Sequence, residues 1–280
     1  MKYAQTVPVL MYHHVSPSGS FINASPQNFE DQLAWLSRHG YRSLGSDEFA
    51  GHLAGQPVPA RSVLITFDDG YLDNWVYAYP LLKKYGFRAL IFLVTSWMGD
   101  GSVRPHLGQE DLPPTPEHRE CERLIDSGRA DDVALRWSEI RAMQADGTFE
   151  FHSHTHTHTR WDKSVRAAEK NTLMARELAD SRASLKEHLG EVSQHLCWPQ
   201  GYFDDDYVRL AQEAGFRYLY TTQAFGQNRA GTDPAGIYRF AVRNAPGASV
   251  GRRVRIAADP VAGPLYNRWK LWKRSLRGKA

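Results

Sequence analysis

Two adjacent acids follow the most strand-like segment of the sequence. The apolar, β-branched run over residues 63–67 predicts a buried strand, and Asp68 and Asp69 come directly after it, before Gly70. Because neighbouring residues at a strand end point in different directions, one carboxylate can bind a metal ion while the other reaches a water molecule on that ion. The alternative is an acidic turn in which one aspartate caps the next helix. The residues alone leave both interpretations open.

Four histidines alternate with small polar residues further along the chain: His152, His154, His156 and His158. On an extended strand all four would point to one face, and in a helix His154 and His158 would share a face at i, i+4. Either backbone keeps that pair together, and residues 148–151 predict a strand that enters the core. A solvated polar edge, or a cluster that binds metal adventitiously, is the alternative.

The two motifs complement each other chemically. One carboxylate and two imidazoles form a ligand set that leaves positions on a metal ion open for water and substrate. Zn²⁺ or a similar ion lowers the pKa of its bound water toward about 7. A second carboxylate can then take the water's proton. Together the motifs predict metal-assisted hydrolysis.

These residues need a scaffold that gathers strand ends. Strand-like and helical patterns alternate, which predicts an α/β fold with a parallel sheet. Strands are expected over residues 7–12, 63–67, 88–95 and 148–152, and near 195–198, 217–221 and 237–242. About seven strands indicate a closed or nearly closed barrel, in which chemistry lies at the C-terminal strand ends.

The helices and loops are expected between these strands. Ser25 and Pro26 form a helix start, and the spacing predicts further helices over 135–145 and 163–189. Residues 98–134, rich in proline, glycine and charge, are expected to be a loop or insertion that shapes a substrate cleft.

The motifs resemble those of a known family. Thr66-Phe67-Asp68-Asp69-Gly70 is similar to the first motif of the polysaccharide deacetylases with a NodB homology domain (carbohydrate esterase family 4), and residues 153–158 to its second motif, Ser-His-Thr-x-x-His. The resemblance implies that Asp69, His154 and His158 bind the metal and that Asp68 is the catalytic base. It also implies a distorted (β/α)7 barrel.

A third motif lies in the C-terminal half. Trp198-Pro199-Gln200-Gly201-Tyr202 resembles the family's Pro-Tyr-Gly-like turn, in which a backbone N–H helps to hold the oxyanion. The resemblance therefore implies an oxyanion or substrate pocket formed by Pro199, Gln200, Gly201 and Tyr202. This sequence has Cys197 where many members have arginine and Gln200 where many have tyrosine, so the motif does not supply the usual contact between arginine and base.

The start of the chain points to one subgroup. Residues 9–15 resemble the N-terminal Leu-x-Tyr-His of the circularly permuted deacetylases that act on poly-β-1,6-N-acetylglucosamine. That match implies His13 as the general acid that protonates the leaving amine, with His14 as the competing candidate. The family's late Leu-x-His motif is missing, and its fourth motif has no clear counterpart.

Composition narrows the class of protein. The chain has 280 residues, 42% hydrophobic and 23% charged, which is typical of a globular protein. Its longest apolar run, residues 89–94, is far shorter than the roughly 20 residues of a membrane-spanning helix. The two cysteines, Cys121 and Cys197, form one disulfide at most and exclude a thiolate metal cluster.

The positive charge is concentrated in the last thirty residues. Residues 251–280 hold nine basic residues and one acid, whereas the remaining 250 residues hold 25 basic and 30 acidic residues. We therefore expect a barrel over residues 1–250 and a basic tail over 251–280. Nucleic-acid binding is not expected, because the body of the protein is acidic.

The tail also carries an apolar stripe. Leu265, Trp269, Trp272 and Leu276 are spaced so that they line one face of a helix. Such a helix either lies on an anionic membrane surface or packs on the barrel with its basic side in solvent.

Together these features predict a metal-dependent N-deacetylase that uses Zn²⁺, or Co²⁺ or Ni²⁺ in its place. The expected substrate is an N-acetylated sugar in a surface glycan or lipopolysaccharide precursor, lipid-linked precursors included. The N-terminus shows no secretory signal, which predicts a cytoplasmic protein, with peripheral contact at the inner membrane through the tail. A hydrolase of another acyl group (a formamide or O-acetyl ester) and a binding protein with a degraded site are the alternatives.

Overall fold

The sheet is the organising element of the structure, a computed structural model that describes residues 2–19 and 21–277. The final residues of the expected tail, 278–280, lie outside this description. The strands are β1 (Val9–Tyr12), β2 (His14–Val15), β3 (Asn23–Ala24), β4 (Arg42–Ser43), β5 (Ser62–Asp69), β6 (Ala89–Leu93), β7 (Phe149–Ser153), β8 (His195–Cys197), β9 (Tyr218–Tyr220) and β10 (Phe240–Ala241). The helices are α1 (Pro26–Arg38), α2 (Ser46–Leu53), α3 (Tyr79–Tyr85), α4 (His118–Asp126), α5 (Trp137–Ala145), α6 (Trp161–Ser164), α7 (Ala167–Leu189), α8 (Asp205–Glu213), α9 (Gly247–Ala258) and α10 (Ala262–Arg277).

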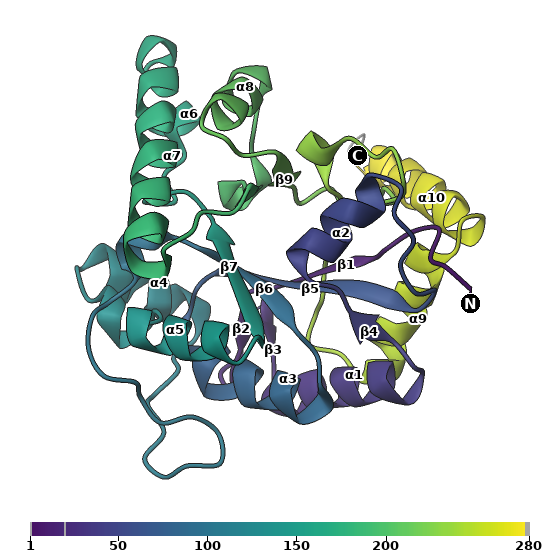
Figure 1. The fold of residues 1–280 in the computed structure, drawn as a ribbon, viewed down its shortest axis with the longest axis horizontal. Helices are drawn as coiled ribbons and strands as arrows, with labels where there is room; N and C mark the ends of the chain where they lie inside the picture. Colours follow the sequence, from purple (N-terminus) through teal and green to yellow (C-terminus); the bar gives the residue numbers. More distant parts are fainter. Residues whose placement is uncertain (1, 20, 278–280) are drawn as a thin grey trace.

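Eight parallel strands form a curved sheet with helices packed around it (Figure 1). Seven of them follow the order β10-β1-β5-β6-β7-β8-β9, and the short strand β4 pairs with the start of β5. Ile237 bridges in parallel to Tyr220 of β9, and three residues later Phe240 pairs with Leu10 of β1. One short segment therefore joins the two edges of the sheet. The fold is the distorted (β/α)7 barrel that was predicted.

Alternation along the strands separates two apolar layers. Leu64 of β5 belongs to a cluster that fills the barrel interior, whereas Ile65 and Phe67 belong to the cluster between the sheet and its helices. Asp68 is in phase with Leu64 and Thr66, because side chains of one strand alternate between faces. The strand period therefore directs Asp68 into the barrel.

The helix start predicted at Ser25 is confirmed. The Ser25 side chain accepts a hydrogen bond at 3.2 Å from the backbone N–H of Asn28, and Pro26 is the first residue of α1. Segment 98–134, expected as a loop or insertion, contains α4 as well as irregular stretches. Glu117 caps that helix by accepting from the Glu120 N–H at 3.2 Å.

One ion-paired turn lies between α5 and β7. Asp146 accepts hydrogen bonds from the hydroxyl of Tyr79 at 2.6 Å and from Nζ of Lys83 at 2.8 Å. Burial alone would raise the pKa of Asp146, but these donors and Thr148 outweigh it and hold the pKa at about 2.

The C-terminal region folds as two helices. α9 packs against α1 and buries Val250, Gly251 and Val254, and α10 packs on α9. Within the described part of the chain, none of the helices combines the length and apolar character needed to cross a bilayer.

Candidate active site

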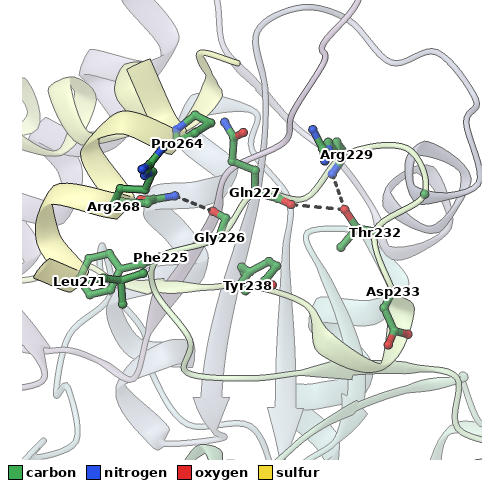
Figure 2. Close-up of a pocket in the computed structure, with 12 residues that line it drawn as sticks. Phe225, Gly226, Gln227, Arg229, Thr232, Asp233, Tyr238, Pro264, Arg268 and Leu271 are labelled. Carbon is green, nitrogen blue, oxygen red and sulfur yellow. Dashed lines mark hydrogen bonds between the residues drawn. The ribbon is translucent and has the colours of Figure 1, made fainter. Parts of the chain in front are cut away.

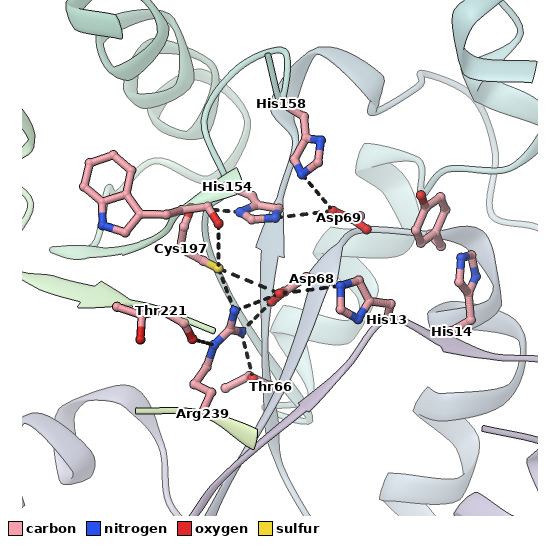
Figure 3. Close-up of polar contacts among 12 residues, drawn as sticks. His13, His14, Thr66, Asp68, Asp69, His154, His158, Cys197, Thr221 and Arg239 are labelled. Carbon is pink, nitrogen blue, oxygen red and sulfur yellow. Dashed lines mark hydrogen bonds and ion pairs between the residues drawn. The ribbon is translucent and has the colours of Figure 1, made fainter. Parts of the chain in front are cut away.

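Three potential metal ligands meet above the barrel. Oδ1 of Asp69 lies 3.3 Å from Nε2 of His154 and 3.6 Å from Nε2 of His158 (Figure 3). The register explains this convergence, because Asp69 pairs with Leu93 on β6 and Leu93 pairs with Ser153 on β7, one residue before His154.

The backbone is strained where these ligands sit. Asp69 and His158 both adopt left-handed conformations, with φ of 77° and 62°, as does Thr155 within the histidine loop. Such conformations are unfavourable for residues with a side chain and tend to persist at functional sites. The turn after β5 and the loop after β7 are therefore shaped to aim these side chains inward.

The other two histidines of the alternating segment point elsewhere. Nδ1 of His152 lies 2.6 Å from Oγ of Ser193, and Nδ1 of His156 lies 2.9 Å from Oγ1 of Thr95. The segment is neither a continuous strand nor a helix: β7 ends at Ser153 and a loop follows. Only His154 and His158 of the four reach Asp69.

Asp69, His154 and His158 fit a divalent metal ion. Oδ1 of Asp69 is buried and has no hydrogen-bond partner among the described residues, which is costly unless a cation binds it. Burial lowers the pKa of His158 to about 4, so this imidazole is neutral at pH 7 and can act as a ligand. Nδ1 of His154 donates to the carbonyl of Cys197 at 2.8 Å, which turns Nε2 toward Asp69.

A second cluster of candidate ligands fits a metal poorly. Asp68, His154 and Cys197 also lie within reach of one another. However, the guanidinium of Arg239 contacts both Asp68 and Sγ of Cys197, and a fixed cation there opposes binding of a second cation.

A buried arginine holds Asp68 in place. Arg239 donates from Nη1 to Oδ1 of Asp68 at 2.6 Å and from Nη2 to Oδ2 at 2.8 Å. Its remaining donors reach Thr66 Oγ1 at 3.2 Å and the carbonyl of Thr221 at 3.0 Å. Burial alone would raise the pKa of Asp68, but the paired guanidinium outweighs it and keeps the pKa below its ordinary value. Asp68 is therefore ionised at neutral pH, as a general base must be.

The two N-terminal histidines have different surroundings. Nε2 of His13 lies 3.8 Å from Oδ2 of Asp68, on the side away from Arg239 (Figure 3). Nδ1 of His14 lies 2.6 Å from Oδ2 of Asp73, and its ring stacks on Tyr71. Burial lowers the pKa of His13. The structure thus brings His13, and not His14, to Asp68.

The third motif borders the same cavity through two of its four proposed residues. Gln200 and Gly201 line it, whereas Pro199 is buried and the Tyr202 ring lies 4.2 Å from the guanidinium carbon of Arg160. The amides of Gly201 and Tyr202 donate within the turn, to the carbonyls of Trp198 and Pro199, which leaves the Gln200 amide as the candidate oxyanion donor.

This turn requires its glycine. Gly201 has φ of 70°, and a Cβ at this position would lie 2.0 Å from Oγ1 of Thr222. Gln200 is also left-handed, with φ of 53°. The strained backbone brings the turn to the edge of the cavity.

The cavity that contains these groups has a volume of about 660 Å³. Segment 98–134 contributes to its wall through His118, Glu122, Ile125 and Asp126, and the aromatic side chains Phe21, Tyr71 and Trp97 complete part of the rim. Charged groups at its base and aromatic side chains at its rim suit a ligand that combines polar groups with apolar surface.

Comparison with known proteins identifies the family. A model of the family described as polysaccharide deacetylase matches residues 55–219, more than half of the chain. The chain belongs to the polysaccharide deacetylase family. Its members carry the NodB domain and depend on a metal ion, and in this chain Asp69, His154 and His158 form a group that could hold one.

The similarity extends over most of the chain. YxkH of Bacillus subtilis (strain 168) is 28% identical over 245 residues, covering 87% of this chain and 73% of that protein. The poly-beta-1,6-N-acetyl-D-glucosamine N-deacetylase of Staphylococcus aureus (strain MSSA476) is 24% identical, covering 80% and 74%. The structure of IcaB from Ammonifex degensii superposes with a TM-score of 0.71 and 25% identity, covering 92% of this chain and 99% of that one.

Sequence reasoning missed two residues of this deacetylase site. Arg239 supplies the arginine contact to Asp68 that the third motif lacks, although 171 residues separate the two in the sequence. The available signal was one arginine inside the apolar run over residues 237–242, a position where a buried charge needs a partner.

The second is Glu177 on α7. Its buried carboxylate accepts hydrogen bonds from the backbone N–H groups of His156 and Thr157, at 2.9 and 2.8 Å, and from the Thr157 hydroxyl at 2.6 Å. It therefore fixes the loop that carries His154 and His158. Its spacing is that of an ordinary helix residue, so the sequence carried no signal.

Proposed function

We propose that this chain is a metal-dependent N-deacetylase that hydrolyses the acetamide of an N-acetylated sugar in a glycan. The observation that carries the proposal is the position of Asp68. Arg239 keeps its carboxylate ionised. Asp68 lies between the Asp69, His154 and His158 cluster on one side and His13 on the other.

The residues divide the reaction among them. Asp69, His154 and His158 would hold Zn²⁺, or Co²⁺ or Ni²⁺ in its place, and such an ion lowers the pKa of a water molecule and polarises a carbonyl group. Asp68 takes the proton from the attacking water as the new C–O bond forms. The Gln200 amide faces the oxygen on which negative charge develops.

His13 completes the reaction. Burial lowers the pKa of His13, so its protonated form is a stronger acid than a free imidazolium, and this form donates a proton to the nitrogen when the C–N bond breaks. Water and the acetamide are thereby converted to acetate and a free amino sugar. Its place near Asp68, with an exposed edge on the cavity, supports this role.

The proposed substrate is a polymer of N-acetylglucosamine. The similarity to the Staphylococcus aureus enzyme named for poly-beta-1,6-N-acetyl-D-glucosamine supports this class. The cavity volume of about 660 Å³ and its aromatic wall can hold part of such a chain. Lipid-linked precursors of surface glycans or lipopolysaccharide form the second substrate class to compare.

Acetate release from a panel of glycans tests the proposal. The panel contains β-1,6- and β-1,4-linked N-acetylglucosamine oligomers, a lipid-linked N-acetylated precursor, and O-acetylated and N-formylated analogues. Release from an N-acetylated member by the wild type, and its loss in Asp68→Asn, is the expected result. Preferential release of formate, or cleavage of the O-acetyl ester alone, would assign the site to another acyl group, and no release from any member would indicate binding alone.

A further inference from the structure

Helix α10 presents its apolar side chains to solvent. Leu265, Trp269, Trp272 and Leu276 are 61%, 43%, 57% and 52% exposed. At 3.6 residues per turn these four side chains fall within about 60° of one another on the helix surface. Val261, in the turn just before the helix, is 68% exposed. We call Leu265, Trp269, Trp272 and Leu276 the apolar stripe.

The helix is attached to the barrel through its opposite face. Gly263 and Asn267 are buried, and Nδ2 of Asn267 donates to the carbonyl of Gly226 at 3.3 Å. A Cβ on Gly263 would lie 2.5 Å from Nε2 of Gln227, so the backbone is close to the barrel here. The helix therefore packs on the protein, as one of the two sequence interpretations expected, but with the apolar stripe turned away from it.

Helix α10 also carries cations that have no ion-pair partner among the described residues. By helical geometry Arg268 and Lys273 lie on the two sides of the apolar stripe, whereas Lys270 and Arg274 start from the opposite half of the helix. Arg268, Lys270, Lys273 and Arg274 belong to α10, and no carboxylate in the described parts of the chain forms an ion pair with any of them. The sequence has no acidic residue after Asp259. Nζ of Lys273 lies 4.2 Å from the ring centroid of Trp269. Basic side chains thus border the stripe within reach of its tryptophans.

We propose that α10 binds the surface of an anionic lipid bilayer, with the apolar stripe inserted at headgroup depth and the cations on lipid phosphates. Tryptophan beside lysine and arginine, on a helix with an unpartnered apolar face, is the pattern of an interfacial helix. A second copy of the chain suits the face less well, because pairing two such helices would bring like charges together. The chemistry of the surface therefore favours lipid.

A cavity next to the helix reinforces this surface. It has a volume of about 540 Å³ and lies between α10 and segment 225–238, with Arg229, Arg268, Tyr238 and Leu271 in its lining (Figure 2). It shares no lining residue with the catalytic cavity. Arg268 on α10 and Arg229 on the opposite wall place positive charge at this cavity, whose lining also holds the carboxylate of Asp233.

Co-sedimentation of the metal-loaded full chain with sucrose-loaded vesicles tests the proposal. We expect binding to vesicles that contain phosphatidylglycerol, weakened by salt, and little binding to pure phosphatidylcholine. Trp269→Gln with Trp272→Gln should weaken partitioning roughly tenfold or more. Arg268→Gln with Lys273→Gln should weaken it about 30-fold, from about fivefold for each cation.

Matched controls separate these effects from general changes in charge and hydrophobicity. Arg176→Gln with Lys186→Gln removes the same charge from the exposed face of α7, and Val103→Gln with Leu107→Gln removes exposed apolar side chains elsewhere. Both control pairs should bind vesicles as the wild type does. The α10 variants should keep wild-type acetate release from a soluble oligomer, which shows that they are folded.

Two results would overturn the proposal. One is equal vesicle binding by the wild type and both α10 variants, or no binding to the anionic vesicles. The other is a dimer in light scattering that dissociates in Trp269→Gln with Trp272→Gln, because a second copy would then cover the stripe. Vesicle binding requires no turnover, so its failure is distinct from a failure of the proposed deacetylation.

Discussion

Removing the guanidinium of Arg239 should damage both folding and catalysis. In Arg239→Met, Asp68 stays in the barrel interior without its two hydrogen bonds of 2.6 and 2.8 Å. Both side chains are almost fully buried, at 0% and 4% exposure. Breaking a buried ion pair on one side costs about 3–5 kcal/mol. That is a large part of the 5–15 kcal/mol by which a typical domain is stable.

A double-mutant cycle isolates this contact. Urea unfolding of metal-stripped wild type, Arg239→Met, Asp68→Asn and the double variant gives four free energies of unfolding. We expect each single variant to be destabilised and the double variant to lose clearly less than the sum, because it leaves no unpaired buried charge. Arg239→Lys keeps the charge but not the paired geometry, and should fall between wild type and Arg239→Met.

The rate of acetate release should also depend on the contact between Arg239 and Asp68. Arg239→Met should reduce acetate release by about 10²-fold or more, since the base is no longer held in position. If the two single losses in stability add within about 0.5 kcal/mol, or if Arg239→Met retains wild-type turnover, the assignment of Arg239 as the residue that ionises and positions Asp68 is refuted.

Three further predictions concern residues around the site and the fold. His13→Gln should lower kcat by about 10²–10⁴-fold while metal binding is retained. His14→Gln should instead lower the midpoint of thermal unfolding and leave kcat unchanged. Steady-state kinetics and thermal unfolding distinguish the two variants, and the reverse pattern would make His14 the general acid. Glu177→Ala should weaken metal binding about 10–100-fold, measured by competition with a chelating dye. Glu177→Gln should weaken it less. Unchanged metal affinity in Glu177→Ala would show that the loop carrying His154 and His158 does not depend on the Glu177 carboxylate. Asp146→Asn should lower the free energy of unfolding by about 1 kcal/mol near pH 7. The pKa of Asp146 in the folded protein, about 2, lies below its unfolded value, so this destabilisation should be complete above pH 4 and vanish as the pH falls through 2. A difference in urea unfolding that does not change with pH would contradict this.

The sequence predicts well that Asp69, His154 and His158 come together, because each lies close to the end of a core strand. Asp69 is the last residue of β5, and His154 and His158 lie within five residues of the end of β7, two strands further along the sheet. Parallel strands in register then bring these ends together, so motif and fold class suffice. The geometry of the histidine loop was not predictable in the same way, because it depends on left-handed residues and on Glu177 from another helix.

The remaining features depend on contacts between distant segments. Arg239 reaches Asp68 only because residues 237–241 close the barrel between β9 and β1. No local sequence pattern predicts that closure. The spacing of the apolar stripe predicted an amphipathic helix at the C-terminus. Which face of that helix packs depends on Gly263 and Asn267 meeting segment 226–227, which only the folded chain shows.

The most direct test of the central claim is acetate release during metal titration of the chelator-treated protein. With an N-acetylglucosamine oligomer as substrate, we predict that wild-type release rises with added Zn²⁺ or Co²⁺ and saturates near one equivalent. Asp68→Asn should bind the same amount of metal and release almost no acetate. Full release without metal, or wild-type release by Asp68→Asn, would contradict the account.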